Sequence, residues 1–276
     1  MKRIISLLIC LILCVSLAAC GSGSGGNGEG EKKVFRVGME CDYAPYNWTQ
    51  TAETDRSVPI ASGGYADGYD VQIAKLIAEG LGMELEIVKI EWDGLTLALQ
   101  SGEIDAIIAG MSPTEERKAT IDFSDPYYES ELVIVVRKDG KYVDAKTMAD
   151  FSGATITGQL NTFHYTVIDQ IPGVNKEVAM ETFPAMIVAL TSGKIDGYIS
   201  ERPGAVSAQE ANPDLTFVEF DPENGFVCSE EDVAIAVGLK KGSDLTEKIN
   251  AILAGIDADT RQQLMDDAVA NQPLSE

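Results

Sequence analysis

The chain has little basic charge, few cysteines and a single histidine. Lys and Arg number 21 against 44 Asp and Glu, which gives a net charge of −23 at pH 7. Such acidity argues against nucleic acid as a partner, because phosphate backbones bind cationic surfaces. No Gly-rich phosphate-binding loop is present, so this chain is not expected to be an ATPase itself. His164 has no Ser or Cys nucleophile pattern near it, and we interpret it as structural or peripheral.

Long apolar runs are also scarce. Residues 4–19 are apolar, follow two basic residues and are too short to span a bilayer comfortably, which predicts a secretory signal over residues 1–19 that is removed. The sequence Leu-Ala-Ala-Cys at 17–20 resembles the lipobox of bacterial lipoproteins, which would leave Cys20 as a lipidated N-terminus. The alternative is an ordinary signal peptide with an incidental cysteine. Residues 20–33 would then form a Gly/Ser-rich flexible tether.

The chain beyond the tether has the composition of a folded, exported protein. Hydrophobic residues make up 45% of the whole sequence, and the roughly 240 residues after the tether can bury substantial cores in one or two domains. Cys41 and Cys228 are the cysteines left in this part. They could form one disulfide, but their wide separation favours free buried thiols. We predict no metal site and no cofactor.

One stretch combines a buried strand, a polar turn and a charged helix start. Residues 104–109 are nearly all apolar, as in a strand covered on both faces, and Gly110 ends the run. The sequence Ser-Pro-Thr-Glu at 112–115 has the form of a capping box, which predicts a helix start capped by Ser112. That helix end would offer free N–H groups to an anion.

Arg117 is unusual in this position, because a cation in the first turn opposes the helix dipole. An external carboxylate would resolve the conflict, since a guanidinium binds a carboxylate bidentately. The alternative is a surface ion pair of Arg117 with Glu116, Asp122 or Asp125.

Four motifs occur in order and carry a resemblance to a known family. They are GYDVQIAKLIAEGLG (68–82), residues 92–99, GMSPTEER (110–117) and FSDPYY (123–128). Together they resemble the extracytoplasmic polar amino-acid-binding proteins that serve ABC importers, over residues 34 to 273. The resemblance implies an α/β fold of two lobes with mostly parallel central sheets, joined by two crossing strands, as in type II periplasmic-binding proteins. Gln72 departs from the acid usual in the family, at a position that we expect to pack within the lobe.

Several elements before this stretch follow from their patterns. Residues 34–38 alternate as a strand, residues 84–90 form another, and Trp92 opens a helix that ends at Gly102. Asp70 precedes an amphipathic helix and is interpreted as its N-cap. The resemblance implies that Glu40, Tyr43 and Trp92 face the ligand side chain, although Trp92 could instead belong to the core.

An internal repeat independently supports two lobes. ALQSGEID at 98–105 recurs as ALTSGKID at 189–196, and continuing the register sets Ala109 and Gly110 opposite Ser200 and Glu201. Because ligands in open α/β sheets bind beyond the carboxyl ends of the strands, each lobe should present one turn to a shared cleft. Lobe one is expected at 34–130 and 232–276, and lobe two at 131–231.

The two turns carry opposite charges, which match a zwitterion. Arg117 would bind the α-carboxylate, and Glu201 the α-ammonium with help from the Gly110 carbonyl and the Ser112 hydroxyl. The family commonly has Asp where Glu201 stands, and Glu201 could instead pair with Arg202. The second lobe would add further contacts through Gln159, Thr162 and Phe163 in a strand and turn where Asn161 replaces the usual Gly.

These observations predict a lipid-anchored protein outside the cytoplasm, which closes by hinge bending on a free amino acid and passes it to an ABC permease. Crossing strands are expected at 131–136 and 230–240. The carboxylate of Glu40 favours arginine or lysine as ligand, with glutamine next, unless Arg36 pairs with it. The rival interpretation is an enzyme on the same fold, such as a dehydratase that uses Glu40 or Glu201 as acid or base.

Overall fold

The computed structural model describes residues 33–221 and 223–273. The predicted signal sequence, Cys20 and the tether up to residue 32 lie outside the described residues. In the described ranges, no helix combines the length and the apolar character that a bilayer span requires. Cys41 and Cys228 are free thiols, the first buried and the second half-buried.

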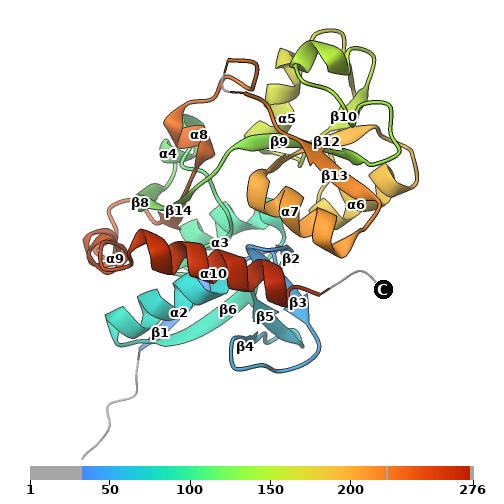
Figure 1. Cartoon of the computed structure of the whole chain (residues 1–276). Helices are drawn as coiled ribbons and strands as arrows, with labels where there is room; N and C mark the ends of the chain where they lie inside the picture. The colour runs from blue at the N-terminus through green and yellow to red at the C-terminus, as the bar shows by residue number, and fades with distance from the viewer. Residues whose placement is uncertain (1–32, 222, 274–276) are drawn as a thin grey trace, which may run out of the picture. The chain divides into compact units, whose positions relative to one another are not determined.

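The first sheet has five strands in the order β6-β1-β7-β14-β8. Figure 1 labels β1, β6, β8 and β14 of this sheet. Its strands are β1 (Val34–Met39), β6 (Glu84–Lys89), β7 (Ala106–Ile107), β8 (Asp122–Glu129) and β14 (Ala234–Leu239). Strand β1 pairs in parallel with β6 and β7, whereas β14 pairs antiparallel with β7 and β8. The six residues of β14 are all buried. This strand from late in the chain therefore lies inside the sheet that contains β1.

The second sheet repeats this arrangement, in the order β11-β10-β12-β9-β13. Its strands are β9 (Leu132–Arg137), β10 (Thr155–Thr157), β11 (Asn175–Lys176), β12 (Gly197–Glu201) and β13 (Leu215–Val218). Strand β10 is parallel to β11 and β12, and β9 is antiparallel to β12 and β13. A third, smaller sheet combines β2 (Asp42–Tyr43), β3 (Asn47–Gln50), β4 (Val58–Pro59) and β5 (Tyr65–Asp67).

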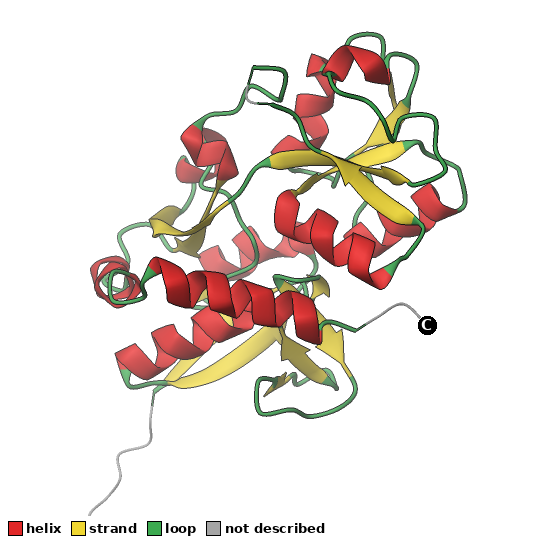
Figure 2. Cartoon of the chain, viewed as in Figure 1, coloured by secondary structure: helices red, strands yellow, loops and turns green. Residues whose placement is uncertain are grey.

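Helices pack on both five-stranded sheets (Figure 2). The first sheet carries α2 (Tyr69–Leu81), η1 (Trp92–Gly94), α3 (Leu95–Ser101), α4 (Glu115–Lys118), α9 (Thr246–Leu253) and α10 (Ala258–Asn271). The second carries η2 (Met148–Phe151), α5 (Phe163–Thr166), η3 (Val167–Gln170), α6 (Phe183–Thr191) and α7 (Arg202–Ala211), and α8 (Glu230–Val233) precedes β14. We call the first sheet with its helices and the small sheet lobe one, and the second sheet with its helices lobe two.

The chain passes between the lobes twice, once from β8 to β9 and once from β13 through α8 to β14. The predicted α/β class with two sheets and two crossings is therefore confirmed. Each sheet is mixed because the strands that follow the crossings pair antiparallel with their neighbours.

The internal repeat has the same hydrogen bonds in both lobes. Gly102 and Gly193 both adopt positive φ, at 85° and 76°, at the end of a helix. The carboxylate of Asp105 then accepts the N–H of Arg36 at 2.9 Å, and the carboxylate of Asp196 accepts the N–H of Thr155 at the same distance. In each lobe this aspartate joins the start of one strand to the neighbouring parallel strand, which helps to set the register between the two strands.

Two predicted helix caps are wrong. Helix α2 begins at Tyr69 after Gly68, so Asp70 lies inside the first turn, where it is fully buried. Helix α4 is capped by Thr114, whose side chain accepts the N–H of Arg117, and not by Ser112. Since Thr114 is itself a good cap, Pro113 falls before the helix, and Arg117 occupies its third position.

Candidate functional site

The candidate site lies where the strand ends of the two lobes meet. Glu40 follows β1, Gly110 follows β7, Gln159 follows β10, and Glu201 ends β12. Strands β1 and β7 are parallel, as are β10 and β12, so each pair delivers its polar residues at one edge of its sheet.

Arg117 reaches across this edge toward lobe two. One guanidinium nitrogen donates to the Ser112 carbonyl at 2.9 Å and another to the Asn161 carbonyl at 3.3 Å. The guanidinium also stacks over Trp92, with 5.0 Å from its carbon to the ring centroid. Desolvation lowers the pKa of Arg117 to about 10, although the negative charges of Glu116 and Glu201 oppose this.

No carboxylate among the described residues lies within ion-pair distance of Arg117. Asp122, one of the surface partners considered above, pairs instead with Lys241 at 2.8 Å. Arg117 is therefore a largely desolvated cation whose donors meet only carbonyl oxygens. Because α4 has only four residues, the guanidinium offers far more to an anion here than the helix dipole does.

Glu201 is the buried anion of the site. It is 2% exposed, accepts a hydrogen bond from the Tyr43 hydroxyl, and has His164 Nε2 2.9 Å from its Oε1. Burial alone would raise the pKa of Glu201, but the charge of His164 and the hydrogen bonds of His164 and Tyr43 hold it below its usual value. Arg202 does not take this role, because it pairs with Glu219 at 2.6 Å.

Glu40 is a second buried carboxyl, 3% exposed. Gln159 Nε2 from lobe two donates to its Oε2 at 3.1 Å. Burial raises the pKa of Glu40 to about 8, Asp42 adds to the shift, and the hydrogen bond from Gln159 opposes it. Arg36 does not neutralise Glu40, because Arg36 pairs with Asp105 at 2.8 Å.

One small cavity is lined by His164 and by eight of the eleven predicted ligand residues. The eight are Tyr43, Trp92, Gly110, Ser112, Arg117, Gln159, Thr162 and Phe163. Glu40 and Glu201 lie behind its wall, hydrogen-bonded to Gln159 and Tyr43. Ala109 is buried one residue before Gly110 and does not line the cavity. The cavity measures only about 10 Å³, enough for about one water molecule. A groove of about 790 Å³ shares Arg117, Thr162 and Phe163 with it and leads outward.

Tertiary contacts hold the Gly110 turn in place. Its φ is 62°, and a Cβ at this position would lie 3.1 Å from the Tyr43 ring, so glycine is required both by the backbone and by the space. The Gly110 N–H bonds to the carboxylate of Asp70, which also accepts from the Tyr127 hydroxyl at 2.7 Å and from Asn47 at 2.8 Å.

Two contributors were missed in the sequence. His164, interpreted above as structural or peripheral, lies at the site, with its Nε2 2.9 Å from Glu201 Oε1. Phe183 stacks on Tyr43 with ring centroids 3.9 Å apart and extends the apolar core from lobe one into lobe two. No local pattern indicates either role, because each partner comes from a distant element.

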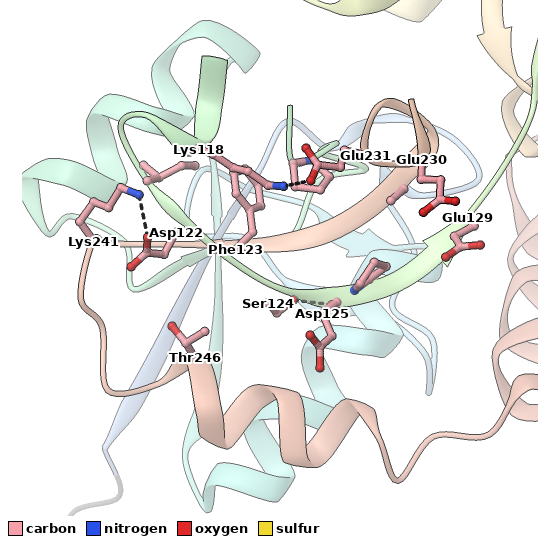
Figure 3. A pocket seen from close by; sticks show the side chains of 14 residues that line it. Lys118, Asp122, Phe123, Ser124, Asp125, Glu129, Glu230, Glu231, Lys241 and Thr246 are labelled. Atoms are coloured by element: carbon pink, nitrogen blue, oxygen red, sulfur yellow. Dashed lines mark hydrogen bonds and ion pairs between the residues drawn. The ribbon is translucent and has the colours of Figure 1, made fainter. Parts of the chain in front are cut away.

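A separate groove of about 520 Å³ on lobe one contains neither Arg117 nor Glu201 (Figure 3). Its two lysines are already paired, Lys118 with Glu231 and Lys241 with Asp122. The further carboxylates of Asp125, Glu129 and Glu230 leave this groove acidic. Across the described ranges, no cluster of His, Cys, Asp and Glu could hold a metal ion. The small cavity remains the place where polar side chains from both lobes converge.

Comparison with known proteins agrees with this geometry. Residues 35–269 match the model of bacterial extracellular solute-binding proteins, family 3. The chain is 29% identical to the arginine-binding extracellular protein ArtP of Bacillus subtilis, over 92% of each chain. It is 31% identical to ABC transporter arginine-binding protein 1 of Escherichia coli, over 72% of this chain and 80% of that protein.

Among solved structures, the fold is similar to that of an amino acid ABC transporter substrate-binding protein from Streptococcus pneumoniae bound to L-arginine. The TM-score is 0.74 at 28% identity, and the match covers 86% of this chain and 94% of that one. The fold is thus that of the type II periplasmic-binding proteins, as the sequence predicted. The chain belongs to family 3 of the bacterial extracellular solute-binding proteins.

Proposed function

We propose that this protein captures a free amino acid between its lobes and delivers it to an ABC importer. The observation that carries the proposal is a pair of opposite charges at one cavity: half-buried Arg117, with no carboxylate partner among the described residues, and buried Glu201 behind the wall on the facing lobe. An α-carboxylate would satisfy the guanidinium, and an α-ammonium would bind the carboxylate. Gly110 and Ser112, which line the same cavity, would complete the shell.

We further propose that the ligand is basic, arginine or lysine, with glutamine next. Glu40 is buried and bonded to an amide, and no cationic side chain of the described residues lies within ion-pair distance of it. A cationic side chain would stabilise its charged form, and an amide could donate to it more weakly. The aromatic rings of Tyr43 and Trp92 line the cavity, where they could flank a long aliphatic stem. The names of the relatives point to the same class of ligand.

An amino acid can enter only if the lobes separate, because the cavity of about 10 Å³ is far smaller than a ligand site, which measures roughly 300 Å³ or more. We propose that residues 34–130 with 232–276 move against 131–231 about the two crossings. Glu40 with Gln159 and Tyr43 with Glu201 form contacts between the lobes that the ligand would join or replace. Closure would then report occupancy to a membrane permease with a separate ATPase chain.

Membership of an extracellular family supports a location outside the cytoplasm. We propose that Cys20 is lipidated and tethers the protein to the membrane. The variant Cys20→Ser should then be found unprocessed or outside the membrane fraction, as determined by fractionation and mass analysis. A wild-type N-terminus without lipid would contradict the anchor while leaving the binding function untouched.

A thermal-shift screen against the twenty amino acids tests the function. A ligand present at about a hundred times its dissociation constant adds roughly 2.7 kcal/mol to stability, so one or a few basic amino acids should raise the melting temperature clearly. If none of the twenty does, the protein is not an amino-acid binder. Conversion of the added compound into another would indicate an enzyme instead.

Calorimetry on Arg117→Ala then tests the assignment of the carboxylate partner. We expect a loss of about 2–5 kcal/mol in binding free energy, the scale for breaking a buried, hydrogen-bonded charge pair. Arg202→Ala is the matched control, because Arg202 is exposed and pairs with Glu219 outside the cavity. Equal affinity in both variants would show that Arg117 does not bind the ligand.

A further inference from the structure

His164 lies in the site without a role in the proposed binding of the zwitterion. It is the only histidine of the chain and is 5% exposed. Its Nε2 is 2.9 Å from Glu201 Oε1, which is ion-pair distance, but neither Nε2 nor Nδ1 has a hydrogen-bond partner of good geometry among the described residues. The rings of Phe163 and Phe183 stand 4.7 and 6.1 Å from the imidazole and keep it away from bulk water.

The groups that face His164 come from several elements. Glu201 lies on β12, Tyr43 on β2 donates to the same carboxylate, and Arg117 of α4 lines the cavity with His164. Glu40 lies behind the Gln159 side of the cavity wall. Of the described cationic side chains, only His164 lies within ion-pair distance of Glu201. A protonated His164 therefore occupies the place that a ligand ammonium needs beside this carboxylate.

We propose that His164 is a positioning residue that orients Glu201 for the α-ammonium of the ligand and that, when protonated, competes with that ammonium for the same carboxylate. The inference deepens the proposed function and rests on it. Two cations beside one buried carboxylate repel each other, so ligand binding expels the imidazole proton. The neutral ring then keeps an N–H for Glu201 through Nε2.

This exchange makes binding depend on pH with a defined sign. If binding releases a proton, then added protons weaken binding, because the coupling is reciprocal. The affinity should therefore rise with pH while that proton is being lost, by up to about tenfold per pH unit where one full proton is released, and level off once the proton is gone.

The proton released by Glu40 must be distinguished from the proton released by His164, because a basic ligand side chain would also expel a proton from the Glu40 carboxyl. Glu40→Gln removes the contribution of Glu40 and leaves that of His164. His164→Gln does the reverse, since its amide can still donate to Glu201 but cannot carry a charge at these pH values. His164→Ala removes both the donor and the charge.

The experiment is calorimetry of arginine binding from pH 5 to 8.5, in two buffers of different ionisation enthalpy, on wild type and these three variants. In Glu40→Gln the affinity should still rise about tenfold or more with pH, with up to one proton released. In His164→Gln the proton count below pH 7 should fall by up to one, and its neutral-pH affinity should exceed that of His164→Ala. An unchanged proton count in His164→Gln would overturn the inference.

A second measurement needs no variant. Because the natural chain has one histidine, the NMR signal of its ring, recorded on protein without added histidines, belongs to His164 alone. At pH 5.5 arginine should move that signal toward the neutral form, and an unmoved signal in a saturated sample would refute the competition. If wild type binds no amino acid at any pH, then the proposed function fails, and not merely this inference.

Discussion

Glu40 shows how a single buried side chain can set both selectivity and pH response. It is 3% exposed, and burial first, then Asp42, raises its pKa from 4.5 to about 8. Near neutral pH this carboxyl is therefore mostly protonated in the unliganded protein. A bound cationic group would draw it into its charged form, which an aliphatic or acidic ligand could not do.

Glu40→Gln should cost arginine and lysine about 2–5 kcal/mol of binding free energy, the scale for a buried charged pair, and glutamine considerably less. Competition titrations on wild type and variant measure the difference. A wild type that prefers aspartate, glutamate or leucine would disprove the assignment of Glu40.

The same variant changes the stability of the unliganded protein. The folded state holds a proton on Glu40 that the unfolded chain releases above about pH 4.5, so this group makes stability fall as pH rises from there to about 8. Glu40→Gln should lessen that fall in urea unfolding measured from pH 5 to 8.5. Parallel curves for wild type and variant would contradict the raised pKa.

At the scale of elements, patterns that depend on neighbouring residues predicted the structure well. Local sequence patterns correctly predicted the strand after Gly102 and its repeat after Gly193. They also agree with the positive φ of Asn161, at 56°. Asp70 was misjudged because its partners, Tyr127 and Asn47, are distant in sequence and bury it inside the helix. His164 was missed for the same reason, since Glu201 lies on another element.

Asp70 links helix α2 to the ligand turn, so we expect Asp70→Ala to weaken both folding and binding. The change leaves the Tyr127 hydroxyl, the Asn47 amide and the Gly110 N–H without their acceptor, at about 1–3 kcal/mol for each buried group left unpaired. Asp257→Ala is the control, because Asp257 caps α10 by accepting the Thr260 N–H at 2.8 Å, outside the cavity.

Urea unfolding and calorimetry separate the two effects. The control should lose about 1 kcal/mol of stability and keep its affinity for the amino acid. Asp70→Ala should lose more stability and also bind more weakly at temperatures where it remains folded. Full affinity in folded Asp70→Ala would show that the Gly110 turn needs no support from α2.

For the molecule as a whole, the contacts between lobes are not confined to the cleft. Helix α10, which packs on α2 of lobe one, also packs on α7 of lobe two (Figure 1). Just beyond its end, the Gln272 side chain accepts from the Ser207 hydroxyl and donates to the Ser207 carbonyl at 3.2 Å. Both residues are buried, at 5% and 3% exposure. Gln272 therefore stabilises the arrangement in which the lobes are closed.

Gln272→Ala should shift the unliganded protein toward open forms. Each of the two lost hydrogen bonds is worth about 0.5–1.5 kcal/mol. Because the ligand must then also supply the energy of closure, its affinity should fall by up to about fivefold to 150-fold. Gln263→Ala is the matched control on the same helix, since the Gln263 side chain donates to Asp267, one turn further along that helix, at 2.9 Å. Small-angle scattering should show a larger radius of gyration for unliganded Gln272→Ala than for the control, and equal radii once arginine saturates both. Equal radii without ligand, together with unchanged affinity, would mean that the cleft contacts alone hold the lobes together.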